Sequence, residues 1–323
     1  MRTITLEEHF ATAGFLDGPG RDLKDQARQI GGRAEQLMRD LCDLGDGRIA
    51  QMDAAGIDMQ VLSLTAPGLE QLEPAEAAAL ARDTNDALAV AIKSHPTRLS
   101  GFAALPIAIP DHAARELETR VRTQGFAGAV VNGHQRGRYL DDRFFSPVLE
   151  AAEALGAPIY LHPTRPPKPV IEASFGGFAP LVTEMLAGPG FGWHIETAVH
   201  VLRMVLGGVF DRFPKLQIVI GHMGEGLPFF MQRVDVMPVE LTRLKRPVSD
   251  YLRENLHYTF AGFNFAPTFL DLLLEVGVSR IMFSADYPYA SMAKARAFLE
   301  QIPVSAADRE RIASRNAETL FKL

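Results

Sequence analysis

The chain has 323 residues, 47% of them hydrophobic, which is enough for one large α/β barrel or for two ordinary domains. Its net charge of −6 and its scattered Lys and Arg residues offer no basic stripe to a phosphate backbone, which argues against a nucleic-acid partner. No apolar run reaches the ~18 residues of a membrane helix, no apolar signal segment opens the chain, and the single Cys42 has no partner for an internal disulfide. We therefore expect a soluble, cytoplasmic protein that does not contact membranes.

The first predicted strand ends with Leu6-Glu7-Glu8-His9-Phe10. Side chains two apart on a strand point to the same face, so Glu7 and His9 can be offered together to a single cation while Glu8 points the other way. The alternative is an acidic strand end with an incidental histidine. Later strands decide between the two, because three of them also end in a His or an Asp.

Strands and helices alternate along the rest of the chain. A long Gly- and Asp-rich excursion with helical patches covers residues 11–45, and a Pro-, Gly- and Phe-rich one covers residues 163–192. Seven further strands are expected at residues 59–64, 99–105, 127–132, 158–162, 217–222, 256–260 and 279–286. Helices are expected at residues 46–55, 74–93, 111–124, 147–155, 194–210, 227–245 and 267–276.

Eight near-continuous apolar strands separated by helices predict an α/β fold with a parallel sheet that is covered on its outside. The simplest solution is a closed (β/α)₈ TIM barrel over residues 1–323 as one domain, with inserted loops after strands one and five. A doubly wound sheet with a second domain is the alternative, and it would usually show a break in composition. In barrels the carboxyl ends of the strands converge on the site, and the side chains placed there are Glu7, His9, His162, His222 and Asp286.

Four of these side chains form a candidate metal site. Glu7, His9, His162 and Asp286 supply two imidazoles and two carboxylates, a mixed nitrogen and oxygen set that suits one Zn²⁺ or Mn²⁺ ion per chain. A single strand-end histidine is more often a packing residue than a ligand. Four such residues at corresponding strand ends make it much less plausible that all of them are packing residues.

His222 begins a glycine-rich stretch, Gly221-His222-Met223-Gly224-Glu225-Gly226. Its spacing matches neither the dinucleotide-binding pattern nor the P-loop. We interpret the glycines as allowing close approach of the backbone to the site, and Glu225 as the group that orients His222 or sets its charge. A plain glycine-rich turn between a strand and a helix is the alternative.

Six stretches spread over the whole chain together resemble the amidohydrolase superfamily. Within it they look like the branch of nonoxidative decarboxylases that includes the γ-resorcylate, 2,3-dihydroxybenzoate and 5-carboxyvanillate enzymes and the aminocarboxymuconate semialdehyde decarboxylase. The stretches are Leu6-Glu7-Glu8-His9-Phe10, Ser63-Leu64-Thr65-Ala66-Pro67, Tyr160-Leu161-His162-Pro163, Gly221-His222-Met223-Gly224-Glu225, Phe283-Ser284-Ala285-Asp286-Tyr287-Pro288 and residues 316–323.

This resemblance implies a mononuclear Zn or Mn site on the four ligands and a catalytic His222 with Glu225. It also implies that Arg233 reaches the substrate carboxylate of a neighbouring subunit, and hence a homodimer or homotetramer. Arg48 matches a second family arginine, although an exposed arginine at a helix start is at least as good a reading. The predicted substrate contacts are Arg233, Arg48, Thr65 and Tyr289. The excursion over residues 166–193, with Trp193 and His194, departs from the relatives and leaves the exact substrate open.

The predicted reaction is loss of CO₂ from a small aromatic acid with a hydroxyl ortho to its carboxylate. Asp286 is the candidate proton donor to the ring carbon, and His222 with Glu225 supports the charge rearrangement. A metal-dependent hydrolase acting on a small cyclic ester or amide is the competing enzyme. Many such hydrolases carry His-x-His on strand one and a modified lysine on strand four, whereas this chain has Glu7-x-His9 and no lysine in Val131-Asn132-Gly133. A metal-stabilised barrel that only binds aromatic acids is the non-enzymatic alternative.

Overall fold

The computed structural model describes residues 1–323 and contains one eight-stranded, all-parallel sheet in the order β1-β2-β3-β4-β5-β6-β7-β8. Its strands are β1 (Ile4–Phe10), β2 (Met59–Leu64), β3 (Leu99–Ala104), β4 (Phe126–Asn132), β5 (Ile159–His162), β6 (Ile218–Ile220), β7 (Leu256–Thr259) and β8 (Ile281–Met282). An isolated parallel bridge from Leu6 to Ser284 brings the last strand back to the first. The predicted (β/α)₈ barrel is confirmed.

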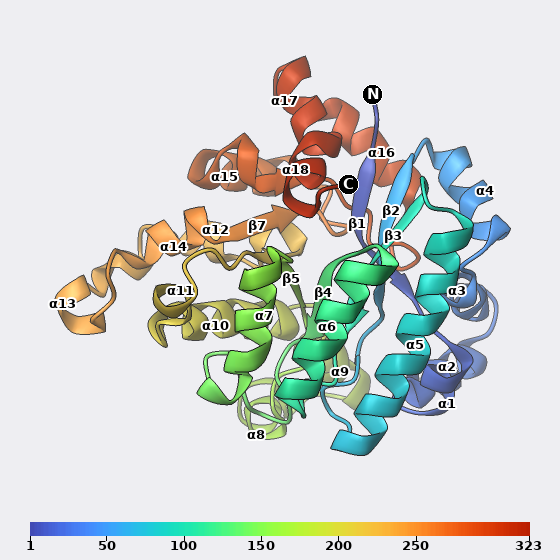
Figure 1. Cartoon of the computed structure of the whole chain (residues 1–323), viewed down its shortest axis with the longest axis horizontal. Helices are drawn as coiled ribbons and strands as arrows, with labels where there is room; N and C mark the ends of the chain where they lie inside the picture. Colours follow the sequence, from blue (N-terminus) through green and yellow to red (C-terminus); the bar gives the residue numbers. More distant parts are fainter.

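Helices follow the strands and surround the barrel (Figure 1). Those between strands one and five are α1 (Ala13–Asp17), α2 (Arg21–Ile30), α3 (Arg33–Cys42), α4 (Asp46–Ala55), α5 (Pro74–Ser94), α6 (Pro110–Gln124) and α7 (Ser146–Leu155). The later ones are α8 (Lys168–Val170), α9 (Pro180–Ala187), α10 (Gly192–Leu206), α11 (Val209–Arg212), α12 (Leu227–Phe230), α13 (Val239–Thr242), α14 (Val248–Glu254), α15 (Ala266–Val276), α16 (Met292–Gln301), α17 (Ala306–Glu310) and α18 (Asn316–Phe321).

Both chain termini lie at one end of the barrel, and α1, α2, α8 and α9 lie at the opposite end (Figure 1). Since β1 starts close to the amino terminus and every strand runs parallel to it, the carboxyl ends of the strands face these four helices. The two excursions of the sequence, residues 11–45 and 163–192, supply all four. They therefore cover the end of the barrel where functional side chains gather.

Two apolar cores stabilise this arrangement. The larger fills the space between the sheet and the surrounding helices. The smaller fills the barrel interior near the termini, where Ile4, Leu6, Phe102 and Tyr160 pack together and Phe321 of α18 closes the end. Layers of side chains inside a small barrel make it a packed core, so the polar site is confined to the other end.

Four predicted elements differ from the structure. The strand expected at residues 217–222 is confined to Ile218–Ile220, and His222 begins a 3₁₀ helix beyond it. The helix expected at residues 194–210 breaks at Gly208, whose positive φ of 67° gives α10 and α11. The helix expected at residues 227–245 is three short pieces, α12, the 3₁₀ helix Val234–Val236 and α13. Pro238, which lacks the N–H that a continuous helix needs, separates the last two. Strand eight is confined to Ile281–Met282, since the chain beyond it turns to form the site.

No single helix is long and apolar enough to cross a membrane. One bent pair, residues 168–175 with residues 180–206, meets the length and composition criteria across a bend of 113°. The cytoplasmic location stays a prediction.

Candidate active site

The end of β1 carries two of the predicted metal ligands. A register shift between Thr5 and Glu8, with a positive φ of 60° at Glu7, interrupts the regular alternation of the strand. Leu6 and Glu7 therefore both lie on the inner face, and His9 follows on that face two residues later. Glu7 and His9 do converge as predicted, through a β-bulge and not through plain alternation.

Glu7 sits deep in the barrel, where its carboxylate is fully buried. The hydroxyl of Tyr160 donates to Oε2, and that hydroxyl also lies 2.7 Å from Oγ1 of Thr259. A Cβ on Gly221 would lie 2.3 Å from Oε2, so only glycine leaves room for this carboxylate. The first glycine of the 221–226 stretch thus allows the close approach that the sequence predicted.

His162 at the end of β5 completes a cluster in which the nearest ligand atoms of Glu7, His9 and His162 all lie within 4.8 Å of one another. Nε2 of His162 is 3.3 Å from Oε1 of Glu7, and Nδ1 donates to the carbonyl of Pro163 at 2.8 Å. Burial lowers the pKa of His162 well below its usual value. The ring is therefore neutral and directs a lone pair at the cluster, as a metal ligand must.

Asp286 lies beside this cluster, with Oδ1 at 3.2 Å from Nε2 of His9. The residues present fit a divalent cation: Oε1 of Glu7 and Nδ1 of His9 are buried without hydrogen-bond partners, and the donor set mixes imidazole nitrogen with carboxylate oxygen. The structure thus brings together all four of the predicted ligand residues.

Glu8, which was expected only to point away from the cluster, has a role of its own. Its buried carboxylate accepts hydrogen bonds from the backbone N–H groups of Ala285 at 2.8 Å and Tyr287 at 3.1 Å, the two neighbours of Asp286. Asp286 itself has a positive φ of 63°. Glu8 therefore holds the strained turn that presents Asp286. The available signal was a second carboxylate next to Glu7 on a strand that is buried along its whole length.

His222 and Glu225 lie on a turn with an unusual backbone. Every residue from His222 to Gly226 has a positive φ, between 48° and 92°, and three of the five are not glycine. Left-handed conformations are costly for such residues, so the turn is strained. It brings Oε1 of Glu225 to 2.7 Å from Nδ1 of His222, and this same nitrogen lies 3.9 Å from Oε1 of Glu7.

Charge is distributed within this pair by mutual attraction. Burial alone would lower the pKa of His222, but the carboxylates of Glu225 and Glu7 outweigh it and raise this pKa to about 10. Burial alone would raise the pKa of Glu225, but the neighbouring imidazoles of His222 and His194 hold it below its usual value. The pair therefore rests as imidazolium and carboxylate.

His194 is a site residue that sequence reasoning treated only as a departure from the relatives. It lies on the first turn of α10, and its Nδ1 is 2.5 Å from Oε2 of Glu225. Its ring also packs edge-on against His222, with centroids 4.6 Å apart. No motif marks His194, because the contact depends on how the second excursion returns to the barrel.

The predicted substrate contacts lie in three different environments. Thr65 is buried, with Oγ1 at 2.6 Å from the hydroxyl of Tyr289, whose ring is 5.3 Å from that of His9. These two residues are next to the cluster. Arg233 is exposed and makes no side-chain hydrogen bond or ion pair within the chain.

The structure gives Arg48 a different role from the predicted substrate contact, and it is not exposed at a helix start either. Its side chain is fully buried, and the guanidinium donates to the carbonyls of His9, Asp40 and Asp43 and to the side chain of Gln60. Arg48 thus supports the end of β1 from behind. Sequence position could not show this, because its partners come from three segments.

Aromatic side chains surround the cluster. Trp193 lies 6.4 Å from His162, Phe263 lies 5.3 Å from His222, and Tyr289 lies beside His9, all by ring centroids and all nearly edge-on. These residues come from α10 and from the loops after β7 and β8. Such a wall suits a planar ring.

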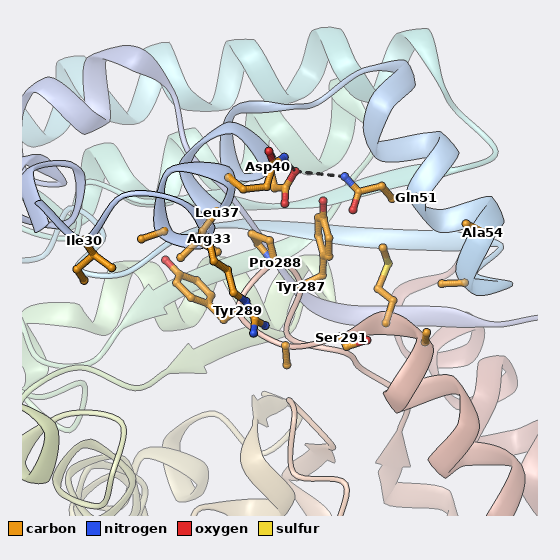
Figure 2. A pocket seen from close by; sticks show the side chains of 16 residues that line it. Ile30, Arg33, Leu37, Asp40, Gln51, Ala54, Tyr287, Pro288, Tyr289 and Ser291 are labelled. Carbon is orange, nitrogen blue, oxygen red and sulfur yellow. Dashed lines mark hydrogen bonds between the residues drawn. The ribbon is translucent and has the colours of Figure 1, made fainter. Parts of the chain in front are cut away.

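A cavity of about 650 Å³ lies on the other side of the loop after β8 (Figure 2). Residues from α2, α3 and α4 line one side, and residues 287–293 line the other. Tyr289 belongs both to this cavity and to the wall around His9. The cavity therefore adjoins the cluster but does not contain it.

An eight-stranded parallel barrel with carboxylates and imidazoles gathered at its strand ends defines a class, the metal-dependent (β/α)₈ barrel enzymes. The sequence profile of the family described as amidohydrolase matches residues 9–323, and the chain belongs to this family. Within it, the chain belongs to the branch of nonoxidative decarboxylases, which are carbon–carbon lyases.

Three relatives place it there. A γ-resorcylate decarboxylase from Polaromonas sp. (strain JS666) is 39% identical, over 99% of this chain and 98% of that protein. A solved dihydroxybenzoic acid decarboxylase from Polaromonas sp. JS666, with bound manganese and the inhibitor 2-nitroresorcinol, is 39% identical with a TM-score of 0.90, over 100% of this chain and 97% of the other. A 5-carboxyvanillate decarboxylase from Novosphingobium aromaticivorans, with manganese and 4-hydroxy-3-methoxy-5-nitrobenzoic acid, is 35% identical with a TM-score of 0.91, over 100% and 96%.

Proposed function

We propose that this protein is a metal-dependent nonoxidative decarboxylase of a hydroxybenzoate that carries a hydroxyl ortho to its carboxylate. The observation that carries the proposal is the cluster of Glu7, His9 and His162 with Asp286 beside it, next to the His222–Glu225 pair. Full-length similarity to decarboxylases of dihydroxybenzoates and of 5-carboxyvanillate supports the substrate class.

The chemistry requires an ortho hydroxyl. Direct loss of CO₂ from an aryl carboxylate would leave an electron pair in the plane of the ring, where the π system cannot delocalise it. An ortho phenolate instead pushes electrons to the carboxylate-bearing carbon, which accepts a proton; the C–C bond pair then returns to the ring as CO₂ leaves. A divalent ion bound at the cluster would supply Lewis acidity and hold the substrate oxygens.

We assign the proton transfer to Asp286, since its carboxyl group is next to the cluster and partly open, with its side chain 19% exposed. His222 as an imidazolium, held by Glu225, would stabilise negative charge on the substrate. Thr65 and Tyr289 would border the ring on the side of His9. The metal would be one Mn²⁺ or Zn²⁺ ion per chain.

Deuterium incorporation tests the reaction. A hydroxybenzoate with an ortho hydroxyl should lose CO₂ in deuterated water, and NMR of the phenol should show deuterium where the carboxylate was. The matched control is benzoate itself, which should bind weakly and stay unchanged. Decarboxylation of benzoate would contradict the role of the hydroxyl. Rapid hydrolysis of esters or lactones, with no decarboxylation across a panel of hydroxybenzoates, would favour the hydrolase.

We further propose that the chain forms a homodimer or homotetramer through the surface around Arg233. Large apolar side chains are exposed on α12 and α13, which flank Arg233 in the chain, and on and just before α15, which packs against α12. Exposed apolar side chains that gather on one face mark interaction sites. The exposed residues are Phe229 at 76%, Phe230 at 48%, Leu241 at 70%, Phe265 at 57% and Leu274 at 84%. Arg233 lies between α12 and α13 and has no partner within its own chain. This fits the expected contact with the substrate of a neighbouring subunit.

Complementation tests this assembly. Arg233→Ala and His222→Ala chains should each be nearly inactive alone. Mixed oligomers should regain activity, because some sites then combine His222 of an Arg233→Ala chain with Arg233 of a neighbouring His222→Ala chain. Light scattering gives the oligomeric state. No recovery in verified hybrids would place Arg233 outside the neighbouring site.

A further inference from the structure

The carboxylate of Glu225 lies between two imidazoles, and only one of them has a role so far. Oε1 faces Nδ1 of His222 at 2.7 Å, and Oε2 faces Nδ1 of His194 at 2.5 Å. All three side chains lie within reach of one another, since their nearest ligand atoms are within 4.8 Å. His194 is 12% exposed, whereas Glu225 is completely buried.

Hydrogen-bond chemistry fixes how this triad is connected. An ionised carboxylate can only accept, so Nδ1 of His194 and Nδ1 of His222 must both carry hydrogen. Each imidazole therefore occupies one oxygen of Glu225. With His194 in place, the carboxylate cannot rotate away from His222 without breaking a second hydrogen bond.

The other nitrogen of His194 faces the second excursion. Nε2 lies 3.0 Å from Nε1 of Trp193, which can only donate, and 3.2 Å from the carbonyl of Pro189, which can only accept. A neutral ring can accept from Trp193, and a protonated ring can donate to Pro189. In both states His194 connects Glu225 to a residue at the start of α10 or just before it.

We propose that His194 is a positioning residue that holds Glu225 against His222 and couples this pair to the start of α10. The inference rests on the proposed function, because it assumes that His222 acts on the substrate. It adds a residue of α10 to the groups that support the proposed reaction. His194 contacts neither the substrate side of Asp286 nor any of the four candidate metal ligands through a hydrogen bond. Its loss should therefore lower turnover without changing metal content.

Two substitutions distinguish the loss of the hydrogen bond to Glu225 from a change in side-chain volume. Asn at 194 places an amide N–H near the position of Nδ1 and can still donate to Glu225, whereas Leu of similar size cannot. We expect His194→Leu to lower kcat by about 10- to 100-fold, the usual effect of removing a group that orients a site residue. KM should stay within about threefold. His194→Asn should recover most of kcat, and metal content by elemental analysis should match the wild type in both variants.

Thr197→Val is the matched control on α10. Thr197 is buried, and its hydroxyl donates to the carbonyl of Trp193 at 2.9 Å, so its loss disturbs the start of α10 without touching Glu225. If disturbance of the helix were the cause, Thr197→Val would lower kcat as much as His194→Leu. That result, an unchanged kcat in His194→Leu, or a rise in KM alone would overturn the proposal.

A measurement without substrate distinguishes this proposal from the proposed function. ¹⁵N-edited NMR detects the Nδ1–H proton of His222 in its hydrogen bond with Glu225. This resonance should shift in His194→Leu and return towards the wild-type position in His194→Asn. The result is independent of turnover, so it tests His194 even if the wild-type protein decarboxylates no hydroxybenzoate. An identical His222 signal in all variants would show that His194 does not position the pair.

Discussion

Glu7 and Glu225 are two buried carboxylates in one site, and their surroundings give them opposite properties. Burial raises the pKa of Glu7 to about 8, because the nearby His222 and Tyr160 offset too little of the desolvation. Burial acts on Glu225 in the same direction, yet the imidazoles of His222 and His194 hold its pKa below the usual value. Equal burial thus leads to opposite charge preferences, and the difference lies in the neighbours.

The difference assigns each carboxylate to a task. Glu225 has its positive charge supplied by the protein, as is usual for a group that orients a catalytic histidine. Glu7 faces the neutral ring of His162 and leaves Oε1 without a hydrogen bond. A carboxylate in that setting becomes favourable as an anion when a divalent cation binds next to it. The protein therefore completes the cluster around Glu225 with its own side chains, whereas we propose that a metal ion completes the cluster around Glu7.

The largest expected effect comes from a pair of matched substitutions at these carboxylates. Glu7→Gln should lose both bound metal and turnover, because an amide oxygen is a far weaker ligand for a cation in this site. Glu225→Gln should keep about one metal ion per chain while kcat falls by about 10²- to 10⁴-fold. Elemental analysis and steady-state kinetics check both. If Glu225→Gln lost its metal, or if Glu7→Gln kept it, the two carboxylates would not have the different roles proposed here.

A smaller effect is expected at Glu8, which is not one of the four candidate ligands but holds the turn that carries Asp286. Glu8→Gln replaces one carboxylate oxygen with an N–H group facing a backbone N–H, so one of the bonds beside Asp286 is lost. We expect kcat to fall by about 10- to 100-fold and the free energy of unfolding by about 1–3 kcal/mol. Kinetics and urea denaturation measure the two losses.

Glu70→Gln is the control for Glu8. Glu70 is equally buried and accepts from the backbone N–H groups of Leu69 at 2.7 Å and Asn132 at 2.8 Å, but it flanks none of the four ligand residues. Its stability loss should be similar and its loss of kcat clearly smaller. Equal losses of kcat in both variants would mean that the effect at Glu8 is only general destabilisation.

The two clusters also differ in how far the sequence predicts them. Glu7, His9 and His162 lie towards the carboxyl ends of strands and Asp286 follows shortly after one. A parallel barrel brings these ends together, so their convergence could be predicted. The pairing of His222 with Glu225 is local and could also be predicted. Strand alternation, however, predicts that Leu6 and Glu8 share the face opposite Glu7 and His9. The bulge at Glu7 instead places Leu6 on the inner face together with Glu7, and no local sequence pattern indicates this bulge.

Contacts between distant segments were beyond such reasoning. His194 meets Glu225 because α10 starts where the second excursion ends, and Arg48 is buried because α3 and α4 enclose it. Glu8 meets residues 285–287 across the point where β8 returns to β1. Each depends on three-dimensional packing of segments whose spacing in sequence carries no periodic signal.

The smallest predicted effect extends the comparison to two buried histidines. His222 is charged because carboxylates face it, whereas His257 on β7 has no carboxylate neighbour and accepts a hydrogen bond from Nη1 of Arg280 at 3.0 Å. Burial and Arg280 lower the pKa of His257 to about 3. His257 therefore stays neutral in the folded protein, while an unfolded chain would protonate it below pH ~6.5.

The sign of the resulting pH dependence follows from proton uptake. Above pH ~6.5 the ring is neutral in both states and has no effect; as the pH falls towards 3, only the unfolded chain binds the proton, so stability is lost. Between pH 7 and pH 5 this amounts to about 2 kcal/mol for one such histidine. In His257→Gln the amide oxygen can still accept from Arg280, and nothing titrates. Urea denaturation at both pH values should show the variant losing about 2 kcal/mol less than the wild type, whereas parallel losses would mean that His257 takes up a proton in the fold as His222 does.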